Sequence, residues 1–185
     1  YDKVVNNGEI RTSGSGSSVF FDEVSGAGSF TGTGHVFFEG NVNPGNSPAV
    51  VNFGGSLTLG SGSHSLIELG GLNPGQFDQF KIAGDLNIMG SLSVALWDNF
   101  ELGSNMSFLI ADIAGNRFGT FQGLGEGALV GRFSGQDLFI TYTAGNGNDI
   151  ALFSAVPEPS ALLLCLMPMI GLLSTRRNRS RDVKR

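Results

Sequence analysis

Catalysis and metal binding depend on His, Cys, Asp and Glu side chains at suitable spacing, and this chain offers few such arrangements. Its two histidines, His35 and His64, lie 29 positions apart, and its single cysteine, Cys165, permits neither an intrachain disulfide nor a cysteine-based zinc site. The neighbouring carboxylates Asp22 and Glu23 would point to opposite faces of a strand, which disfavours a paired acid/base role. We therefore expect no metal centre, and we interpret both histidines as exposed polar residues near glycine turns.

Further carboxylates occur around Glu68, Asp78, Asp85, Asp98 and Glu101. Polysaccharide-cleaving enzymes commonly use two carboxyl groups at a defined separation. Nothing in the spacing of these five residues selects such a pair. We predict a body without catalytic residues and without a cofactor, and a polysaccharide-active enzyme is the alternative.

The segment 144–150 is similar to one calcium-binding nonapeptide of the RTX type, Gly-Gly-x-Gly-x-Asp, with Ala144 in place of the first glycine. Such sites need adjacent copies to surround the ion with enough oxygen atoms. Asn146, Asn148 and Asp149 are therefore no more than candidate calcium ligands. We predict instead that the segment is a turn joining residues 139–142 to residues 150–153.

The end of the chain combines a proline-rich motif, an apolar run and a basic tail. Residues 159–175 are 17 consecutive uncharged residues, which as a helix would cover ~25 Å of the ~30 Å hydrocarbon core of a bilayer. They predict a transmembrane helix over 160–175, with the tail 176–185 in the cytoplasm by the positive-inside rule and residues 1–156 outside. The alternative is an apolar helix packed on a soluble core. The basic residues of the tail are Arg176, Arg177, Arg179, Arg181, Lys184 and Arg185.

The motif before the apolar run is Val156-Pro157-Glu158-Pro159. Its two prolines remove backbone donors and keep the segment extended, which exposes it to a protease. The order of motif, apolar run and arginine cluster resembles the PEP-CTERM sorting signal, also described as the ice-binding protein C-terminal domain, over residues 155 to about 181. This resemblance implies cleavage by exosortase near the motif. It also implies transient residence in the inner membrane of a Gram-negative-type bacterium, followed by transfer to the cell surface or extracellular matrix.

Charge is distributed unevenly along the chain. Residues 1–156 carry 5 Lys/Arg and 14 Asp/Glu, whereas residues 157–185 carry 6 Lys/Arg and 2 Asp/Glu. A nucleic-acid binder needs a basic face on its folded domain, so an acidic body with a short basic tail excludes nucleic acid as a partner.

Glycine and alternating apolar residues predict an all-β body. The chain has 29 glycines among 185 residues, about twice the usual share. Apolar residues alternate with polar ones in short segments separated by glycine turns, and no helical period occurs before residue 160. Residues 55–59 are echoed 29 positions later by residues 84–88, and residues 65–69 are echoed 26 to 27 positions later. Periods of this length are typical of solenoids and similar arrays, and a β-sandwich that repeats such a strand by chance is the alternative. The predicted inward residues are Leu57, Leu59, Leu86, Ile88, Leu92, Val94, Ile110 and Ile140.

A second resemblance concerns residues 27–154. The segments 43–48, 77–84 and 119–121 resemble the autotransporter-type passenger repeat, with Ala49 where those repeats usually have a glycine. This resemblance implies a right-handed parallel β-helix (solenoid). We expect that body over 27–154, a truncated or loosely ordered stretch over 1–26, and the sorting signal over 155–185, which contains one transmembrane helix.

The function expected from these features is that of an exported surface or matrix protein with a non-catalytic, structural or adhesive body. The expected partners are exosortase, the membrane through a single span, and exopolysaccharide. The alternative is a β-helical carbohydrate-active enzyme, or a glycan- or ice-binding adhesin, with the same tail. Threonine is too sparse in the body for the regular rows that favour ice binding.

Overall fold

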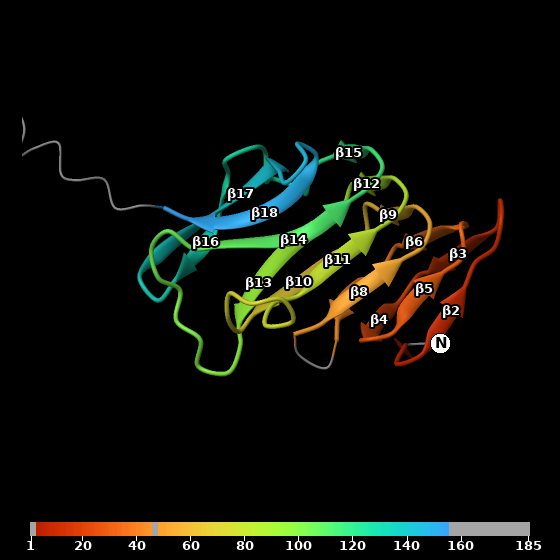
Figure 1. The fold of residues 1–185 in the computed structure, drawn as a ribbon, viewed down its shortest axis with the longest axis horizontal. Coiled ribbons are helices and arrows are strands. Elements are labelled where there is room, and N and C mark those ends of the chain that lie inside the picture. Colours follow the sequence, from red (N-terminus) through yellow and green to blue (C-terminus); the bar gives the residue numbers. More distant parts are fainter. Residues whose placement is uncertain (1–2, 46–47, 156–185) are drawn as a thin grey trace, which may run out of the picture. The chain divides into compact units, whose positions relative to one another are not determined.

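The computed structural model describes residues 3–45 and 48–155, and these residues form strands joined by turns and loops (Figure 1). In chain order the strands are β1 (Lys3–Val5), β2 (Glu9–Arg11), β3 (Ser17–Phe20), β4 (Glu23–Gly26), β5 (Ser29–Thr31), β6 (His35–Phe38), β7 (Asn41–Pro44), β8 (Val50–Phe53), β9 (Leu57–Leu59), β10 (His64–Leu69), β11 (Gln79–Ile82), β12 (Leu86–Ile88), β13 (Ser91–Leu96), β14 (Ser107–Ile113), β15 (Arg117–Gly119), β16 (Leu129–Phe133), β17 (Gln136–Ala144) and β18 (Asp149–Ser154).

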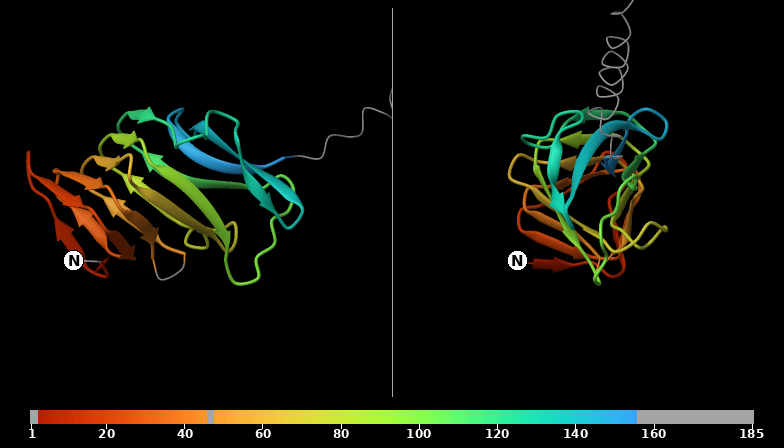
Figure 2. Two further views of the ribbon diagram at one scale, coloured as in Figure 1. Left: turned by 180° about the vertical axis from the view of Figure 1, so that it is seen from behind. Right: turned by 90° about the vertical axis from the view of Figure 1, so that its left-hand side faces the viewer.

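The first fifteen strands wind in coils, and each coil contributes one strand to each of three sheets. Every strand from β1 to β12 pairs in parallel with the strand three places later in the chain. The first sheet has the order β1-β4-β7-β10-β13, the second β16-β17-β18-β14-β11-β8-β5-β2, and the third β15-β12-β9-β6-β3. Figure 2 shows the three sheets arranged around one interior.

The last three strands break this pattern. β18 pairs antiparallel with β14, and β17 and β16 follow, each antiparallel to its neighbour. The turn between β16 and β17 is Ser134–Gly135, with φ of 50° and 80°. Positive φ at both central residues is the mark of a type I′ turn, which returns the chain beside itself as an antiparallel hairpin.

The predicted fold class, a right-handed parallel β-helix followed by one transmembrane helix, was therefore wrong. The second sheet is mixed because the tight turns after residue 128 reverse the chain. No helix occurs in residues 3–45 and 48–155, and so nothing in these ranges has the length and hydropathy that a membrane-spanning helix requires. The segment 160–175 lies outside the described residues.

The paired strands begin earlier than expected. Lys3 in β1 is already aligned with Glu23 in β4, and Glu9 in β2 with Ser29 in β5. The stretch 1–26, expected to be truncated or loosely ordered, thus supplies β1 to β4. One compact unit extends to residue 155, where the sorting segment was expected to begin.

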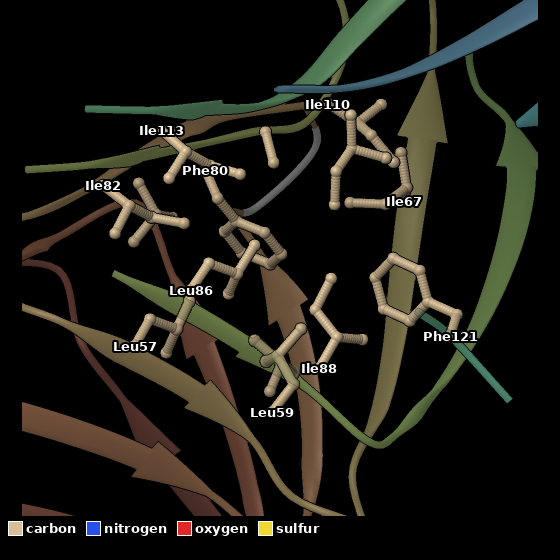
Figure 3. Packing of buried hydrophobic residues seen from close by; sticks show 14 of the residues in the cluster. Leu57, Leu59, Ile67, Phe80, Ile82, Leu86, Ile88, Ile110, Ile113 and Phe121 are labelled. Atoms are coloured by element: carbon tan, nitrogen blue, oxygen red, sulfur yellow. The ribbon is translucent and has the colours of Figure 1, made fainter. Parts of the chain in front are cut away.

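The interior is filled by inward rows of apolar side chains that repeat from coil to coil (Figure 3). In the third sheet, parallel register aligns Phe38 with Leu59 and Leu59 with Ile88. Predicted core residues that are buried are Leu57, Leu59, Leu86, Ile88, Ile110 and Ile140, which confirms those six positions. Leu92 and Val94 are half-buried, because β13 is the last strand of the first sheet.

The loop 120–128 closes the interior at the C-terminal end of the coils. Phe121 is buried in the core, and its backbone N–H donates to the hydroxyl of Tyr142 at 3.0 Å. The same hydroxyl donates to the Leu124 carbonyl at 2.7 Å. The Glu126 carboxylate accepts hydrogen bonds from the Thr141 hydroxyl and the Tyr142 backbone N–H. These bonds fix the loop to β17.

Candidate binding surface

A groove crosses the outward face of the second sheet. Its volume is about 430 Å³. One row of polar side chains crosses β5, β8, β11 and β14 and consists of Ser29, Asn52, Lys81 and Asp112. Because aligned residues on parallel strands lie ~4.8 Å apart, the row is a regular ladder of hydrogen-bonding groups. We call this surface the second-sheet groove.

Small residues beside this row make the hollow. Gly54, Ala83 and Ala114 follow β8, β11 and β14, and they line the groove together with Gly32. A Cβ atom at Gly54 would lie 2.7 Å from the carbonyl oxygen of Gly32. The stacking of the coils therefore requires glycine there, and the same requirement leaves the groove unfilled.

The charged groups of the groove are available to a ligand. Lys81 and Asp112 are aligned on β11 and β14. The ion pairs of the described residues are Lys3–Glu23 at 2.6 Å and Arg132–Asp137 at 3.6 Å, so Lys81 and Asp112 are not paired with each other. A cation, a carboxylate, an amide and a hydroxyl in one row suit a polyhydroxylated chain that donates and accepts hydrogen bonds. Asp112 is the one carboxylate among the lining residues, so the groove has no pair for acid/base chemistry.

The two histidines lie on different sheets. His64 on the first sheet contacts the hydroxyls of Ser91 and Ser93, each at 2.9 Å. His35 on the third sheet contacts the Thr58 hydroxyl at 2.8 Å, and burial lowers its pKa, partly offset by the charge of Asp85. Both are half-buried, less exposed than the sequence suggested. Across the described ranges, no group of three or more His, Cys, Asp or Glu residues is arranged to hold a metal ion.

Two of the five carboxylates named from the sequence come together. Glu68 and Asp78 line one cavity of about 220 Å³ on the first sheet. Asp78 is fully buried, and its two oxygens accept hydrogen bonds from the backbone N–H groups of Ala49 at 2.7 Å and Glu68 at 2.8 Å. Burial raises the pKa of the Asp78 carboxyl to about 7, although both hydrogen bonds oppose that shift. Asp78 thus connects β10 with two other segments, which are the chain before β8 and the loop before β11.

The other three carboxylates lie elsewhere. Asp85 accepts a hydrogen bond from the backbone N–H of Asn116 at 2.7 Å, at the turn between the second and third sheets. Asp98 and Glu101 lie in the loop 97–106 between β13 and β14. They do not line the cavity that contains Glu68 and Asp78.

The turn 144–149 joins β17 to β18, as predicted. The Asp149 carboxylate accepts hydrogen bonds from the backbone N–H groups of Ile113 at 2.8 Å and Asn146 at 3.3 Å. The side-chain amides of Asn146 and Asn148 donate to the carbonyls of Ile113 and Gly115. Of these three side chains, only Asn148 has an oxygen that is buried without a hydrogen-bond partner, whereas calcium takes six to eight oxygen ligands.

The sorting residues named from the sequence lie outside the described residues. They are Val156 to Pro159, Arg176, Arg177, Arg179 and Arg181. Sequence analysis missed the groove residues, although one signal pointed to two of them. Asn52 and Lys81 are 29 positions apart, the same spacing as the echo between residues 55–59 and 84–88.

Comparison with protein-family models, with curated proteins and with solved structures found no match.

Proposed function

We propose that this chain is an exported surface or extracellular-matrix protein of a Gram-negative-type bacterium, with a non-catalytic, structural or adhesive body. Its partner is exopolysaccharide, bound in the second-sheet groove. A C-terminal PEP-CTERM signal sorts it, and exosortase cleaves it near Pro157. The observation that carries the adhesive part is the ladder from Ser29 to Asp112, beside which small residues leave the groove unfilled.

The groove suits a polymer better than a small molecule. It is shallow and lined by residues of four successive coils, so a ligand must be extended in the direction in which the coils stack. Compact ligands favour enclosed and mostly apolar pockets. Hydroxyl-rich chains can instead exchange their water contacts for bonds to Asn52, Lys81 and Asp112 without being enclosed.

A glycan-binding assay tests the adhesive part. The probes are neutral, uronic-acid and amino-sugar polysaccharides, together with exopolysaccharide purified from the host. Ala114→Trp should fill one end of the groove and lower binding at least tenfold, as should Asn52→Ala combined with Lys81→Ala. Arg132→Ala, on the β16–β17 hairpin, is the matched control and should leave binding unchanged. If no probe binds, or if both groove variants bind normally, the adhesive proposal fails.

Mass spectrometry of the surface form from its own host tests the sorting part. The mature protein should end near Pro157, and peptides from residues 162–185 should be absent. Deleting the exosortase of the host should restore the full-length C-terminus. Recovery of Arg185 on the surface form in a strain with active exosortase would contradict cleavage.

A carbohydrate-active enzyme is the second candidate, and one observation favours it. Glu68 and Asp78 line the same cavity, and a carboxyl with a pKa of about 7 is the kind of group that serves as a general acid near neutral pH. Against it, both oxygens of Asp78 already bind backbone N–H groups. Release of new reducing ends or unsaturated sugars from the same polysaccharides, abolished by Glu68→Gln, would favour the enzyme.

A further inference from the structure

The outward face of the first sheet carries a polar cavity separate from the second-sheet groove. This cavity, of about 220 Å³, contains Glu68 and lies across β4, β7 and β10. Ser25 and Asn43 line it from aligned positions of β4 and β7. None of its lining residues belongs to the second-sheet groove. We call it the first-sheet cavity.

Glu68 has a fixed backbone and an available carboxylate. Its backbone N–H donates to a carboxylate oxygen of Asp78 at 2.8 Å, and Asp78 is fully buried. The Glu68 side chain is half-buried, and neither ion pair of the described residues includes it. An ionised carboxylate accepts hydrogen bonds through both oxygens, so it can bind two neighbouring hydroxyl groups of one ligand.

Trp97, the single tryptophan of the chain, is 43% exposed beside this cavity. Parallel register aligns Glu68 with Ala95, and Trp97 follows Ala95 by two positions on the same outward face. With ~3.3 Å per residue along a strand and ~4.8 Å between strands, the Cα atoms of Glu68 and Trp97 lie roughly 8 Å apart. The short side chain of Ala95 does not separate them.

The indole ring of Trp97 is held against the end of β10. The Trp97 N–H donates to the Leu69 carbonyl at 2.8 Å, and the Trp97 carbonyl accepts a hydrogen bond from the Phe100 N–H at 3.0 Å. A Cβ atom at Gly70 would lie 3.3 Å from Cδ1 of the ring, so glycine there lets the ring lie close to the backbone. A side chain fixed in this way loses little conformational entropy when a ligand covers it.

An exposed aromatic ring beside a carboxylate suits a ligand with an apolar face and hydroxyl groups at its edge. A pyranose ring has this form, because its C–H bonds make an apolar face and its hydroxyls project around the rim. An anionic lipid surface suits it less, because Glu68, Asp98 and Glu101 place negative charges near Trp97 in space or in the chain. Glu68 disfavours a sugar carboxylate for the same reason.

We propose that Trp97 and the first-sheet cavity form a second glycan site, which binds an uncharged sugar unit of the exopolysaccharide. The sugar ring stacks on the indole of Trp97, and neighbouring hydroxyls donate to the Glu68 carboxylate. The inference rests on the proposed function for the class of its ligand, but its residues are not those of the second-sheet groove. Two sites on one body strengthen binding of a polymer, because the second contact becomes intramolecular.

The fluorescence of Trp97 reports on this site alone, because the chain has no other tryptophan. The full chain, in a detergent without sugar headgroups, is titrated with cellohexaose, with an oligogalacturonate of the same length and with neutral oligosaccharides released from the host exopolysaccharide. At least one neutral probe should shift the emission maximum to shorter wavelength and saturate. The oligogalacturonate should bind at least tenfold more weakly, and Glu68→Gln should remove most of this difference.

Variants around the ring test its position. Gly70→Ala should displace the ring and lower the affinity for the neutral probe at least tenfold, whereas Gly125→Ala, where a Cβ atom has open space, is the matched control. Calorimetry extends the comparison to Trp97→Ala, which should lose at least tenfold in affinity. Phe118→Ala removes a similarly exposed aromatic ring from the third sheet and should leave the affinity unchanged. Circular dichroism checks that each variant is folded.

Asn52→Ala combined with Lys81→Ala separates the two glycan sites, and it should leave the Trp97 titration unchanged. If no sugar changes the fluorescence while this double variant still lowers polymer binding, the second site is overturned and the proposed function stands. A response to anionic lipid vesicles but to no sugar also overturns it. A response to neutral sugars, together with normal polymer binding by the double variant, supports the Trp97 site and contradicts the second-sheet groove alone.

Discussion

Asp78 is a buried carboxyl group that joins three separate parts of the chain. Its oxygens accept hydrogen bonds from Ala49 and Glu68, and burial raises its pKa to about 7. In the unfolded chain its pKa is about 3.9. Between these two pH values, the folded state keeps a proton on Asp78 that the unfolded state has released. The stabilisation that results is complete below about pH 4 and is lost as the pH rises through about 7.

The free energy of unfolding should therefore fall between pH 4 and pH 7, by up to roughly 1 kcal/mol per pH unit from this residue. Chemical denaturation of the wild type and of Asp78→Asn across this range measures it. The variant should be less stable at low pH, because an amide cannot accept both backbone hydrogen bonds, and its pH dependence should be flatter. Parallel profiles for the two proteins would show that Asp78 does not titrate in this window.

Ile88 tests the packing of one inward row at the same scale. It is 3% exposed and lies between the aligned residues Leu59 and Gly119. Ile88→Ala should lower the free energy of unfolding by about 2 to 5 kcal/mol, because it leaves a cavity that the coils cannot close. The adjacent residue Met89 is half exposed, so Met89→Ala should change stability by no more than about 0.5 kcal/mol. Equal effects of the two substitutions would contradict the inward register of β12.

At the scale of elements, glycines at one corner allow the coils to stack. Gly34, Gly55, Gly84 and Gly115 lie between the strands of the second and third sheets, and Gly84 and Gly115 donate hydrogen bonds to the carbonyls of Gly55 and Gly84. A Cβ atom at Gly84 would lie 2.7 Å from the backbone nitrogen of Ser56 and 2.8 Å from the carbonyl carbon of Gly55. Part of the glycine excess in this chain is therefore required by the close approach of successive coils at this corner.

Gly84→Ala should therefore separate two coils at this corner and cost about 1 to 3 kcal/mol of stability. Gly125→Ala is the matched control, because a Cβ atom there has open space and its φ is not positive. Thermal unfolding of both variants provides the comparison. A melting temperature for Gly84→Ala within error of the control would show that the corner can widen at no cost.

Across the whole molecule, local patterns predicted strands better than they predicted connections. Alternation identified Leu57 and Leu59 in β9 and Leu86 and Ile88 in β12, and the echo of 29 positions is the register between these two strands. The alternation of apolar and polar residues is visible within five residues of sequence. The reversal at Ser134–Gly135 was missed, because the resemblance to parallel repeats outweighed a dipeptide that favours a hairpin.

The early coils were not recognised in the sequence because coil length varies along the chain. In the third sheet, aligned residues are 18 positions apart from Ser17 to His35, 21 from Val36 to Leu57, 29 from Leu57 to Leu86 and 31 from Leu86 to Arg117. Because the period increases along the chain, the repeat has no single spacing by which it can be recognised in the sequence. For the same reason neither the groove row nor the contact of Asp78 with Ala49 could be derived before the register was known.

The parallel pairing between coils also determines how the body responds to force. The hydrogen bonds between coils lie in the direction of stacking, so a load applied between the first and last coils acts on one coil boundary after another. Each coil that detaches should release 18 to 31 residues, or about 60 to 110 Å of chain. A matrix built from such bodies would yield in small steps and absorb work before breaking. Single-molecule pulling should record a series of short extensions, and one extension that releases the entire body at once would refute stepwise yielding.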